Sequence, residues 1–586
     1  GVTRRGETGA VTLEADAVTV AALVQKVDVP AVVELAAGQT LTAGTLARTA
    51  GSAALEIGAE KGTGTLAAGA DGIVFDNPTA EAAIRVRAAL AGTAAQTLAK
   101  AGAGTVVFDN AFAWPGRIDL PFGELRVVDP ASPHAAALFG QGVYTLDGAG
   151  TRTLAGSAEG FAGTFRLAGG VTRIKNAAAL GGPATTLVVT NGAALDLSGG
   201  LEGTTFNNLV LGTKNIFLAG DGPDGLGALR PEAFDPAAGG EAGATNQGWN
   251  VISGARLTLM GDATIGSPGQ TRWNIKDTVF DQQGHTLTFA NKGRIGLFES
   301  TVTNAGPVVL AAHEKGEEGG LCFGAALFGA ADAPPITAHG GTHFTWQSAQ
   351  SFAQVRPLEI LGATTFYNFH AYNNTVADTG YNGWAGPVRL VDADARLTLH
   401  VYNQSARALR LDGPVSGAGG LRMNGSGRYY VMNPTNTFSG ALDCSGTNWG
   451  VWEFGWAGSI PDYSKATFGT GVVALASDDT NRWPMAAFAK FMNEAHFLDG
   501  KTSVGFDTTF GDQRLVLDNL VVTNTAYDAI RNLGPGRLVV EGPGIFPGAL
   551  KLDVTGVVEV TGAAHVALTN RGDQMTLRPR PDGWTS

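Results

Sequence analysis

The sequence predicts an all-β protein built as a right-handed parallel β-helix, a β-solenoid with irregular loop insertions and one short helix near residues 484–493. Three observations support this prediction. A short phrase recurs at irregular spacing, the chain alternates with the period of two that strands show, and glycine supplies 84 of the 586 residues. Glycine at this level is consistent with frequent tight corners that need positive φ.

The repeated phrase consists of a Gly-x-Gly corner, a short strand, a polar turn, and an aromatic-x-Gly element that opens the next strand. Self-similarity of this kind is the signature of stacked repeats. No Pro/Ser-rich linker separates units, which argues against tandem sandwich domains. The irregular spacing argues against propeller blades, whereas β-helix turns tolerate corner loops of different length. The copies begin at Gly102, Gly148 and Gly417, and their second elements are Trp114-Pro115-Gly116, Phe161-Ala162-Gly163 and Phe438-Ser439-Gly440.

Short alternating segments run through the chain from its beginning, for example Val11–Leu13, Val32–Leu35 and Leu41–Leu46. Turn residues punctuate these segments, so each predicts a strand. The best helical pattern has Pro484 near the N1 position and good helix formers as far as Asn493. We expect three parts: a repeat-rich β-helix at 1–210, a continuation with long aromatic-rich insertions at 211–480, and the short helix with C-terminal β-helix turns at 481–586.

Charge and cysteine content indicate which binding partners and which cellular location to expect for this chain. The chain carries 40 Lys and Arg against 52 Asp and Glu, a net charge of −12, and no basic stripe, so we expect no nucleic-acid partner. Cys322 and Cys444 form no disulfide framework and are either two buried free thiols or one bridge. Low cysteine and lysine content in a long acidic β protein is typical of bacterial secreted or surface proteins, so we expect an extracellular or cell-surface location.

The apolar runs are all shorter than the ~18 residues of a membrane helix, so we expect no transmembrane segment in this chain. No apolar segment of a signal peptide follows Gly1. We therefore expect the signals for export and anchoring to lie outside this chain.

The segment Gly148–Leu197 resembles the passenger-associated repeat of bacterial autotransporter-type surface proteins. The resemblance is carried by Gly148-Ala149-Gly150, by Phe161-Ala162-Gly163, and by the run from Leu187 to Leu197. In that family each unit forms one or two β-helix turns, which implies the same fold here. The family includes adhesins, structural stalks and degradative enzymes, so the resemblance implies a surface protein without choosing among these activities.

The middle of the chain is dense in aromatic and amide side chains, which suit the faces and hydroxyl groups of sugar rings. The alternative is packing, because aromatic residues also form ladders inside β-helices. We expect these aromatic and amide side chains to lie near one flank of the solenoid. The candidate glycan contacts are Trp346, Tyr367, His370, Tyr372, Tyr381, Trp384, Trp449, Trp452 and Trp456.

The sequence does not locate a catalytic or metal-binding site, because it contains no nucleophile elbow, phosphate loop, zinc motif or calcium loop. A pair of carboxylates cleaves glycosidic bonds by acid/base catalysis, yet the sequence does not show which two face each other. We expect no cofactor and no metal. The acid/base candidates, if the protein is an enzyme, are His313, Glu314, Glu317, Glu318, His343 and Glu453.

Three functions follow from these patterns. The leading one is a secreted or cell-surface β-solenoid that acts as a structural stalk or adhesin, with the aromatic midsection as a candidate glycan-contacting patch. The first alternative is an extracellular polysaccharide lyase or glycoside hydrolase on a β-helix scaffold. The second is a self-assembling surface filament, since uncapped solenoid ends expose strand edges that favour end-to-end association.

Overall fold

The computed structural model describes most of the chain between residues 2 and 568. The residues that it does not describe are 1, 6–8, 131–136, 198–200, 203–204, 207–210, 232–250, 268–272, 292–293, 313–318, 325–327, 347–351, 369–380, 402–407, 447–448, 478–481, 499, 510, 517–520, 542–550, 555–556, 562–566 and 569–586.

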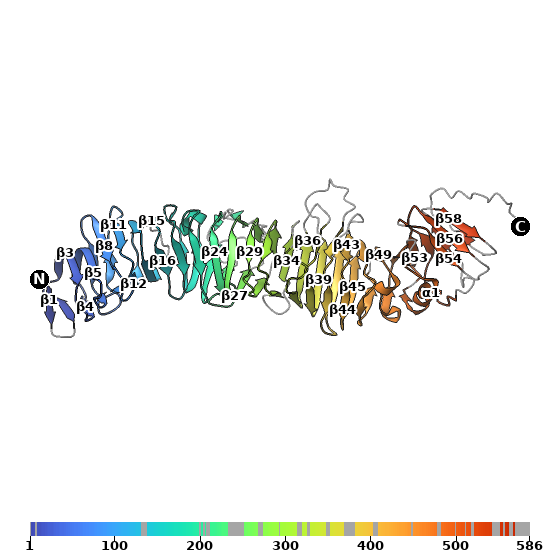
Figure 1. Cartoon of the computed structure of the whole chain (residues 1–586), viewed down its shortest axis with the longest axis horizontal. Helices are drawn as coiled ribbons and strands as arrows, with labels where there is room; N and C mark the ends of the chain where they lie inside the picture. Colours follow the sequence, from blue (N-terminus) through green and yellow to red (C-terminus); the bar gives the residue numbers. More distant parts are fainter. Residues whose placement is uncertain are drawn as a thin grey trace. The chain divides into compact units, whose positions relative to one another are not determined.

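The described chain is nearly all parallel β structure and forms a β-solenoid of about 19 turns in all (Figure 1), which confirms the predicted fold class. It divides into two compact units, Gly1–Gly319 and Gly320–Ser586. Among the described strand pairs, the antiparallel ones are β1 (Val2–Arg5) with β2 (Ala10–Leu13), and β22 (Leu201–Glu202) with β23 (Thr205–Phe206). Parallel pairing predominates because each strand stacks on its equivalent one turn earlier.

The first unit contains one long stack that begins with β1 and β2. It continues through β4 (Ala31–Glu34), β6 (Leu55–Ile57), β9 (Ile84–Val86), β12 (Thr105–Phe112), β14 (Glu124–Pro130), β16 (Val143–Leu146), β18 (Thr164–Leu167), β20 (Thr186–Val189), β24 (Asn215–Gly220), the first half of β27 (Arg256–Ser267), β29 (Val279–Asp281) and β32 (Thr301–Thr303).

A second stack of this unit contains β17 (Thr151–Leu154), β19 (Gly170–Ile174), β21 (Ala193–Asp196), β25 (Leu229–Arg230), the second half of β27, β30 (Leu287–Asn291) and β33 (Val308–Ala312). A third contains β26 (Val251–Ser253), β28 (Trp273–Lys276) and β31 (Arg294–Phe298). The N-terminal turns add a separate sheet of β3 (Ala17–Gln25), β5 (Thr40–Arg48), β7 (Thr65–Ala68), β8 (Gly72–Asp76), β10 (Ala89–Ala91), β11 (Thr97–Ala101), β13 (Arg117–Leu120) and β15 (Ala137–Gly140).

The second unit has three long sheets and a shorter fourth, and the turns between residues 336 and 454 supply one strand to each long sheet in order. The β38 sheet contains β35 (Ile336–His339), β38 (Leu358–Leu361), β41 (Val388–Leu390), β44 (Val415–Gly417) and β47 (Thr437–Phe438). The β39 sheet contains β36 (Thr342–Trp346), β39 (Ala363–Asn368), β42 (Arg396–Val401), β45 (Gly420–Gly425), β48 (Leu442–Cys444), β50 (Ala466–Phe468) and β52 (His496–Phe497).

The β40 sheet contains β37 (Phe352–Gln354), β40 (Tyr381–Trp384), β43 (Ala408–Leu411), β46 (Arg428–Val431), β49 (Gly450–Phe454), β51 (Gly471–Ala476), β53 (Thr502–Asp507), β55 (Ile530–Asn532), β57 (Lys551–Val554) and β59 (Ala567–Leu568). A further sheet of β54 (Gln513–Val516), β56 (Arg537–Glu541) and β58 (Val557–Thr561) occupies the last turns, and β34 (Gly319–Phe323) lies at the boundary of the units.

Equivalent positions of successive turns stack into apolar ladders that form the core. In the β39 sheet, Phe344, Phe366 and Leu399 lie at matching positions, and all three are fully buried. Trp384 and Leu411 begin the corresponding ladder of the β40 sheet. Because side chains alternate across a strand, the residues between these positions point away from the core. The period of two in the sequence therefore sorts inner from outer residues.

The repeated phrase marks places where successive turns come very close together. Gly148 has φ of 104°, and a Cβ atom there would lie 1.9 Å from the Val128 carbonyl oxygen. A Cβ atom at Gly163 would lie 2.1 Å from the Gly142 carbonyl oxygen, while Phe161, two residues earlier, is fully buried. In aromatic-x-Gly, the ring therefore fills the core and the glycine admits the preceding turn.

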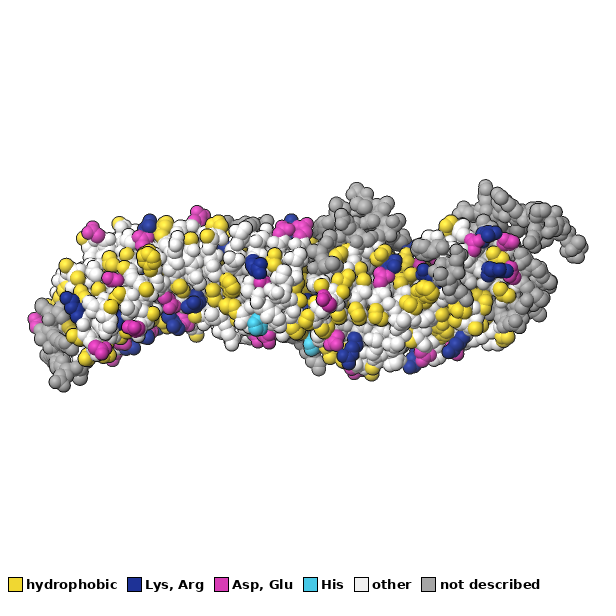
Figure 2. Space-filling model, viewed as in Figure 1, with side chains coloured by type: hydrophobic (Ala, Val, Ile, Leu, Met, Phe, Trp, Pro, Cys, Tyr) yellow, Lys and Arg dark blue, Asp and Glu magenta, His cyan; other side chains and the backbone are white. Residues whose placement is uncertain are grey.

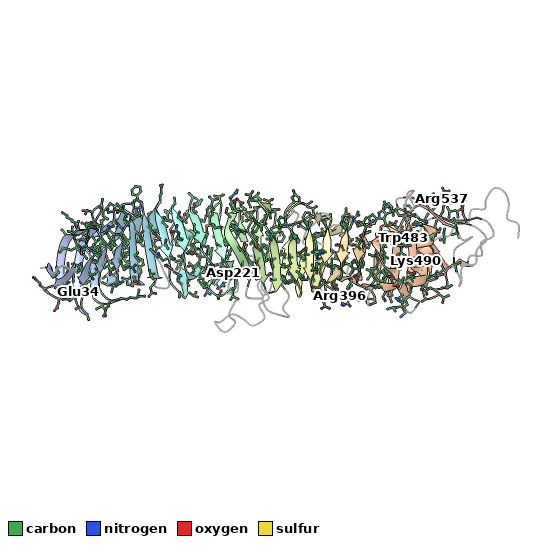
Figure 3. All side chains as sticks on the ribbon, turned by 60° about the horizontal axis from the view of Figure 1, so that its bottom comes forward. Glu34, Asp221, Arg396, Trp483, Lys490 and Arg537 are labelled. Atoms are coloured by element: carbon green, nitrogen blue, oxygen red, sulfur yellow. The ribbon has the colours of Figure 1, made fainter. Side chains whose placement is uncertain are left out.

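The predicted helix is confirmed as α1 (Met485–Glu494), with Pro484 at its N-cap. It is the α-helix of the described chain, and its buried face consists of Phe488, Phe491 and Met492. Trp483, labelled with Lys490 in Figure 3, lies 5.7 Å from Phe491 between ring centroids. The helix thus packs its apolar face against the solenoid core.

Two smaller predictions have clear outcomes. Cys322 and Cys444 are both buried thiols, and they form no disulfide with each other. Within the described parts of the chain, no helix combines the length and apolar character needed to cross a membrane.

Candidate functional site

Three of the predicted glycan contacts lie in the core. Trp346 and Trp384 are fully buried, and both pack against Phe366 with ring centroids 5.0 and 5.7 Å apart. Trp452 is 1% exposed and packs on Phe468 at 5.9 Å. The packing interpretation thus describes these rings, and we do not include them in a binding surface.

Six other predicted residues lie outside the described part of the chain. They are His370 and Tyr372 among the glycan contacts, and His313, Glu314, Glu317 and Glu318 among the acid/base candidates.

His343 and Tyr367 lie together on the outer side of the β39 sheet. Their rings meet edge to face at 5.4 Å, and Tyr367 meets His400 at the same distance. His343 is 8% exposed and covers Gly320, where a Cβ atom would lie 2.1 Å from its Nε2. Burial lowers the pKa of His400, which keeps its imidazole neutral at neutral pH. This stack of rings fills the outer surface and leaves little exposed imidazole for catalysis.

The outer side of the β40 sheet brings together charged and aromatic side chains from several turns. Arg410 pairs in register with Tyr430, and Tyr430 pairs with Glu453, so the three side chains lie on adjacent strands. They point outward because the residues that flank them in each strand belong to the core. We call this face the arginine surface and define it by Tyr381, Arg410, Arg428, Tyr430, Glu453, Trp456, Arg482 and Asp507.

Each arginine of this surface is associated with an aromatic ring. The Arg410 guanidinium lies 4.3 Å from the centroid of the Tyr381 ring, and Arg482 lies 4.8 Å from that of Trp456. Arg428 hydrogen bonds with the Tyr430 hydroxyl. Such cation–π contacts hold the planar guanidinium groups in fixed orientations. The rings and the cations therefore form one organised patch.

Glu453 is the buried acid of the arginine surface. Its residue is 4% exposed, and its carboxyl forms no hydrogen bond or ion pair with any residue that the structure describes. Burial, together with the nearby Asp507 carboxylate, raises the pKa of Glu453 to about 8, against the opposing effect of Arg428, Arg410 and Arg482. At neutral pH this carboxyl is therefore mostly protonated and carries a proton that a ligand oxygen can accept as a hydrogen bond.

The sequence reasoning identified Tyr381, Glu453 and Trp456 but missed the arginines, Tyr430 and Asp507. Their signal was present, because a polar residue between two apolar ones, as in Leu409-Arg410-Leu411 or Trp452-Glu453-Phe454, predicts an outward side chain. Trp449, also predicted, lies just before β49 and is 56% exposed.

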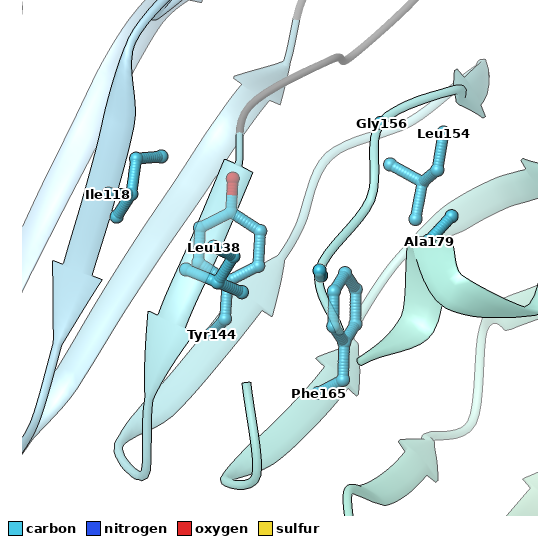
Figure 4. A pocket seen from close by; sticks show the side chains of 8 residues that line it. Ile118, Leu138, Tyr144, Leu154, Gly156, Phe165 and Ala179 are labelled. Atoms are coloured by element: carbon cyan, nitrogen blue, oxygen red, sulfur yellow. The ribbon is translucent and has the colours of Figure 1, made fainter. Parts of the chain in front are cut away.

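A small internal cavity lies elsewhere, in the first unit (Figure 4). Its volume is about 10 Å³, and its lining includes Ile118, Leu138, Tyr144 and Phe165. This is no more than the space of one water molecule, and the lining is mostly apolar. The cavity therefore holds no organic ligand.

Neither a charged patch nor a cluster of metal ligands indicates another site in the described part of the chain. Acidic and basic side chains are interspersed over the described part of the face in Figure 2. No group of three or more His, Cys, Asp or Glu side chains that could hold a metal ion occurs among the described residues. In comparisons with known proteins, no family model matches the chain, and neither a curated protein nor a solved structure is significantly similar to it.

Proposed function

We propose that this chain is a secreted or cell-surface β-solenoid that serves as a structural stalk or adhesin and contacts glycans through the arginine surface. The observation that carries the proposal is the set of aromatic rings and arginines on neighbouring strands of one outer sheet face. The resemblance of Gly148–Leu197 to passenger-associated repeats supports the surface location and an origin in a bacterial surface protein.

The geometry suits a linear glycan. Sugar rings present C–H faces that stack on aromatic rings, and their hydroxyl groups need fixed polar partners. Strands in a parallel stack are ~4.8 Å apart, so side chains on successive turns contact a polymer at regular intervals. Tyr381, Tyr430 and Trp456 supply the rings, and the three arginines supply donors.

Binding of the purified chain to a panel of linear polysaccharides tests this proposal. We expect the Trp456→Ala and Tyr381→Ala variants to bind about tenfold more weakly, because each loses a ring contact of about 1 to 2 kcal/mol. Phe122→Ala is the matched control, since Phe122 is 65% exposed in the other unit. Absence of binding by the wild-type chain, or unchanged binding by the double variant, contradicts the proposal, provided that thermal unfolding shows folded variants.

A second candidate function is an extracellular glycoside hydrolase or polysaccharide lyase. It is favoured by Glu453, a protonated acid whose proton affinity is increased by the nearby Asp507 carboxylate. Two carboxyl groups with different protonation states are the arrangement that acid/base cleavage of glycosidic bonds requires.

The same panel separates the two candidates when released reducing ends and unsaturated products are measured. Turnover that is lost in Glu453→Gln, with binding retained, supports the enzyme. Binding without products supports the adhesin.

A further inference from the structure

The arginine surface contains a buried acid with no hydrogen-bond partner among the described residues, which the function proposed above does not explain. A buried polar group without a hydrogen bond costs free energy, about 1 to 3 kcal/mol in proteins. The Glu453 residue is only 4% exposed and its carboxyl forms no hydrogen bond with the described residues, but its oxygens still touch solvent, so the carboxyl carries only part of this cost. A ligand that accepts a hydrogen bond from this carboxyl would supply the missing partner.

The groups that face Glu453 come from three strands and one loop. Arg410 is on β43, Arg428 and Tyr430 are on β46, and Asp507 ends β53. Arg482 precedes α1 and contacts Trp456. Three guanidinium groups therefore lie close enough to act electrostatically on one acid, while Asp507 supplies the opposing charge.

Two of these guanidinium groups have described partners. Arg410 donates from Nε to Asp412 at 2.7 Å, and Arg428 is exposed and shares a hydrogen bond with the Tyr430 hydroxyl. A guanidinium has five N–H donors, so these single contacts leave donors that face solvent. Arginine is the side chain best suited to bidentate binding of carboxylates.

We propose that this cluster binds the carboxylate of an acidic glycan, with the Glu453 carboxyl and Arg428 donating hydrogen bonds to it. The inference rests on the proposed function and names its ligand class, a polymer that contains uronic acids. A carboxylate fits better than a sulfate because it is the more basic anion and the stronger acceptor for a carboxylic acid.

The proposal predicts how binding depends on pH. Below a pH of about 8 the Glu453 carboxyl keeps its proton and donates a hydrogen bond to the ligand. Above that pH it is ionised, and both it and Asp507 repel an anionic ligand. The pKa of Arg428 is raised, chiefly by its interaction with the Tyr430 hydroxyl, and burial raises the pKa of Tyr430, so these two groups keep their protons in this range. Binding therefore weakens as the pH rises through about 8.

The net charge of −12 opposes non-specific binding of acidic polymers to this chain. A chain with this charge repels polyanions on average, so attraction to an acidic polymer needs a local site.

Arg389→Gln is the matched control for Arg428→Gln, because Arg389 is in the same unit, is 60% exposed and pairs with Glu359 at 3.1 Å.

The experiment measures affinity for polygalacturonate, for its carboxyl-reduced neutral form, and for a sulfated glucan, at about pH 6 and about pH 9.5. We expect the wild-type chain to bind polygalacturonate about tenfold more tightly than the neutral form at the lower pH, and to lose this preference at the higher pH. Glu453→Gln should retain the preference at both pH values, because its amide also donates and does not ionise. Arg428→Gln should lose it, and Arg389→Gln should keep it.

Each other outcome is decisive. Equal binding of the charged and neutral polymers overturns this inference and leaves the proposed function in place. Equal binding of the sulfated polymer overturns the preference for carboxylate, and a pH dependence that persists in Glu453→Gln overturns the role of Glu453. Failure to bind any polymer contradicts the proposed function itself.

Discussion

Trp384 donates a hydrogen bond from its indole Nε1 to the backbone carbonyl oxygen of Arg356 at 2.6 Å. The two residues come from successive turns, and both are fully buried. The same indole ring lies 5.5 Å from Phe344 and 5.7 Å from Phe366. Trp384 therefore links turns of the second unit by both packing and hydrogen bonding.

Replacing Trp384 by Ala should lower the free energy of unfolding by about 3 to 5 kcal/mol, because it leaves a cavity and an unpaired carbonyl oxygen. Denaturant unfolding followed by circular dichroism measures this loss. Trp449→Ala is the control and should change stability by less than about 0.5 kcal/mol, since Trp449 is 56% exposed. Equal effects of the two variants would contradict the assignment of Trp384 to the core.

Gly163→Ala should destabilise the first unit by about 1 to 3 kcal/mol, because the new methyl group would overlap the Gly142 carbonyl oxygen and push two turns apart. Gly261→Ala is the matched control in the same unit, where the nearest atom to a new Cβ is that of Ala219, at 3.8 Å. Thermal unfolding of both variants checks the prediction. A Gly163→Ala protein as stable as Gly261→Ala would show that the aromatic-x-Gly glycine has no steric role.

Glu453 should make stability depend on pH. Its pKa is raised from 4.5 to about 8 in the folded chain, so folding takes up a proton between these values. The contribution of this group is fully present below about pH 4.5 and is lost as the pH rises through about 8, at on the order of 1 kcal/mol per pH unit. In Glu453→Gln this dependence should disappear, and the variant should be more stable than wild type at about pH 8.

Unfolding midpoints of both proteins across this pH range test the sign. Parallel curves for the two proteins would show that Glu453 is not a buried protonated acid.

Strand β3 should favour self-association, as the sequence predicts for a solenoid end. Among the described strands it pairs with β5 alone, so its other edge has unpaired backbone groups over nine residues. Val24→Lys should reduce concentration-dependent association in sedimentation velocity, because a charge on an edge strand opposes pairing with another strand. Val29→Lys is the control, since Val29 is similarly exposed, at 40% against 42% for Val24, but lies beyond the strand. A wild-type chain that stays monomeric at high concentration would contradict the prediction.

Much of the scaffold was predictable, because its determinants are local. Pro484 and the helix formers after it predict α1 within one residue of its observed start. The Gly-x-Gly and aromatic-x-Gly elements predict stacked turns, since corners and close contacts restrict which residues fit. The same alternation that predicts strands also indicates that Trp452 faces inward when Glu453 faces outward. The density of aromatic residues alone does not distinguish inward from outward rings.

The sequence by itself determined the β-solenoid, its helix and the acidic character of the chain, because strand periodicity, capping and glycine corners are properties of neighbouring residues. Only the tertiary structure decided which side chains meet across turns. Arg410, Tyr430 and Glu453 are separated by about 20 residues each along the chain, and the loops between them vary in length. Their meeting depends on the strand register, which backbone hydrogen bonding and the fit of the core ladders set only when the turns stack.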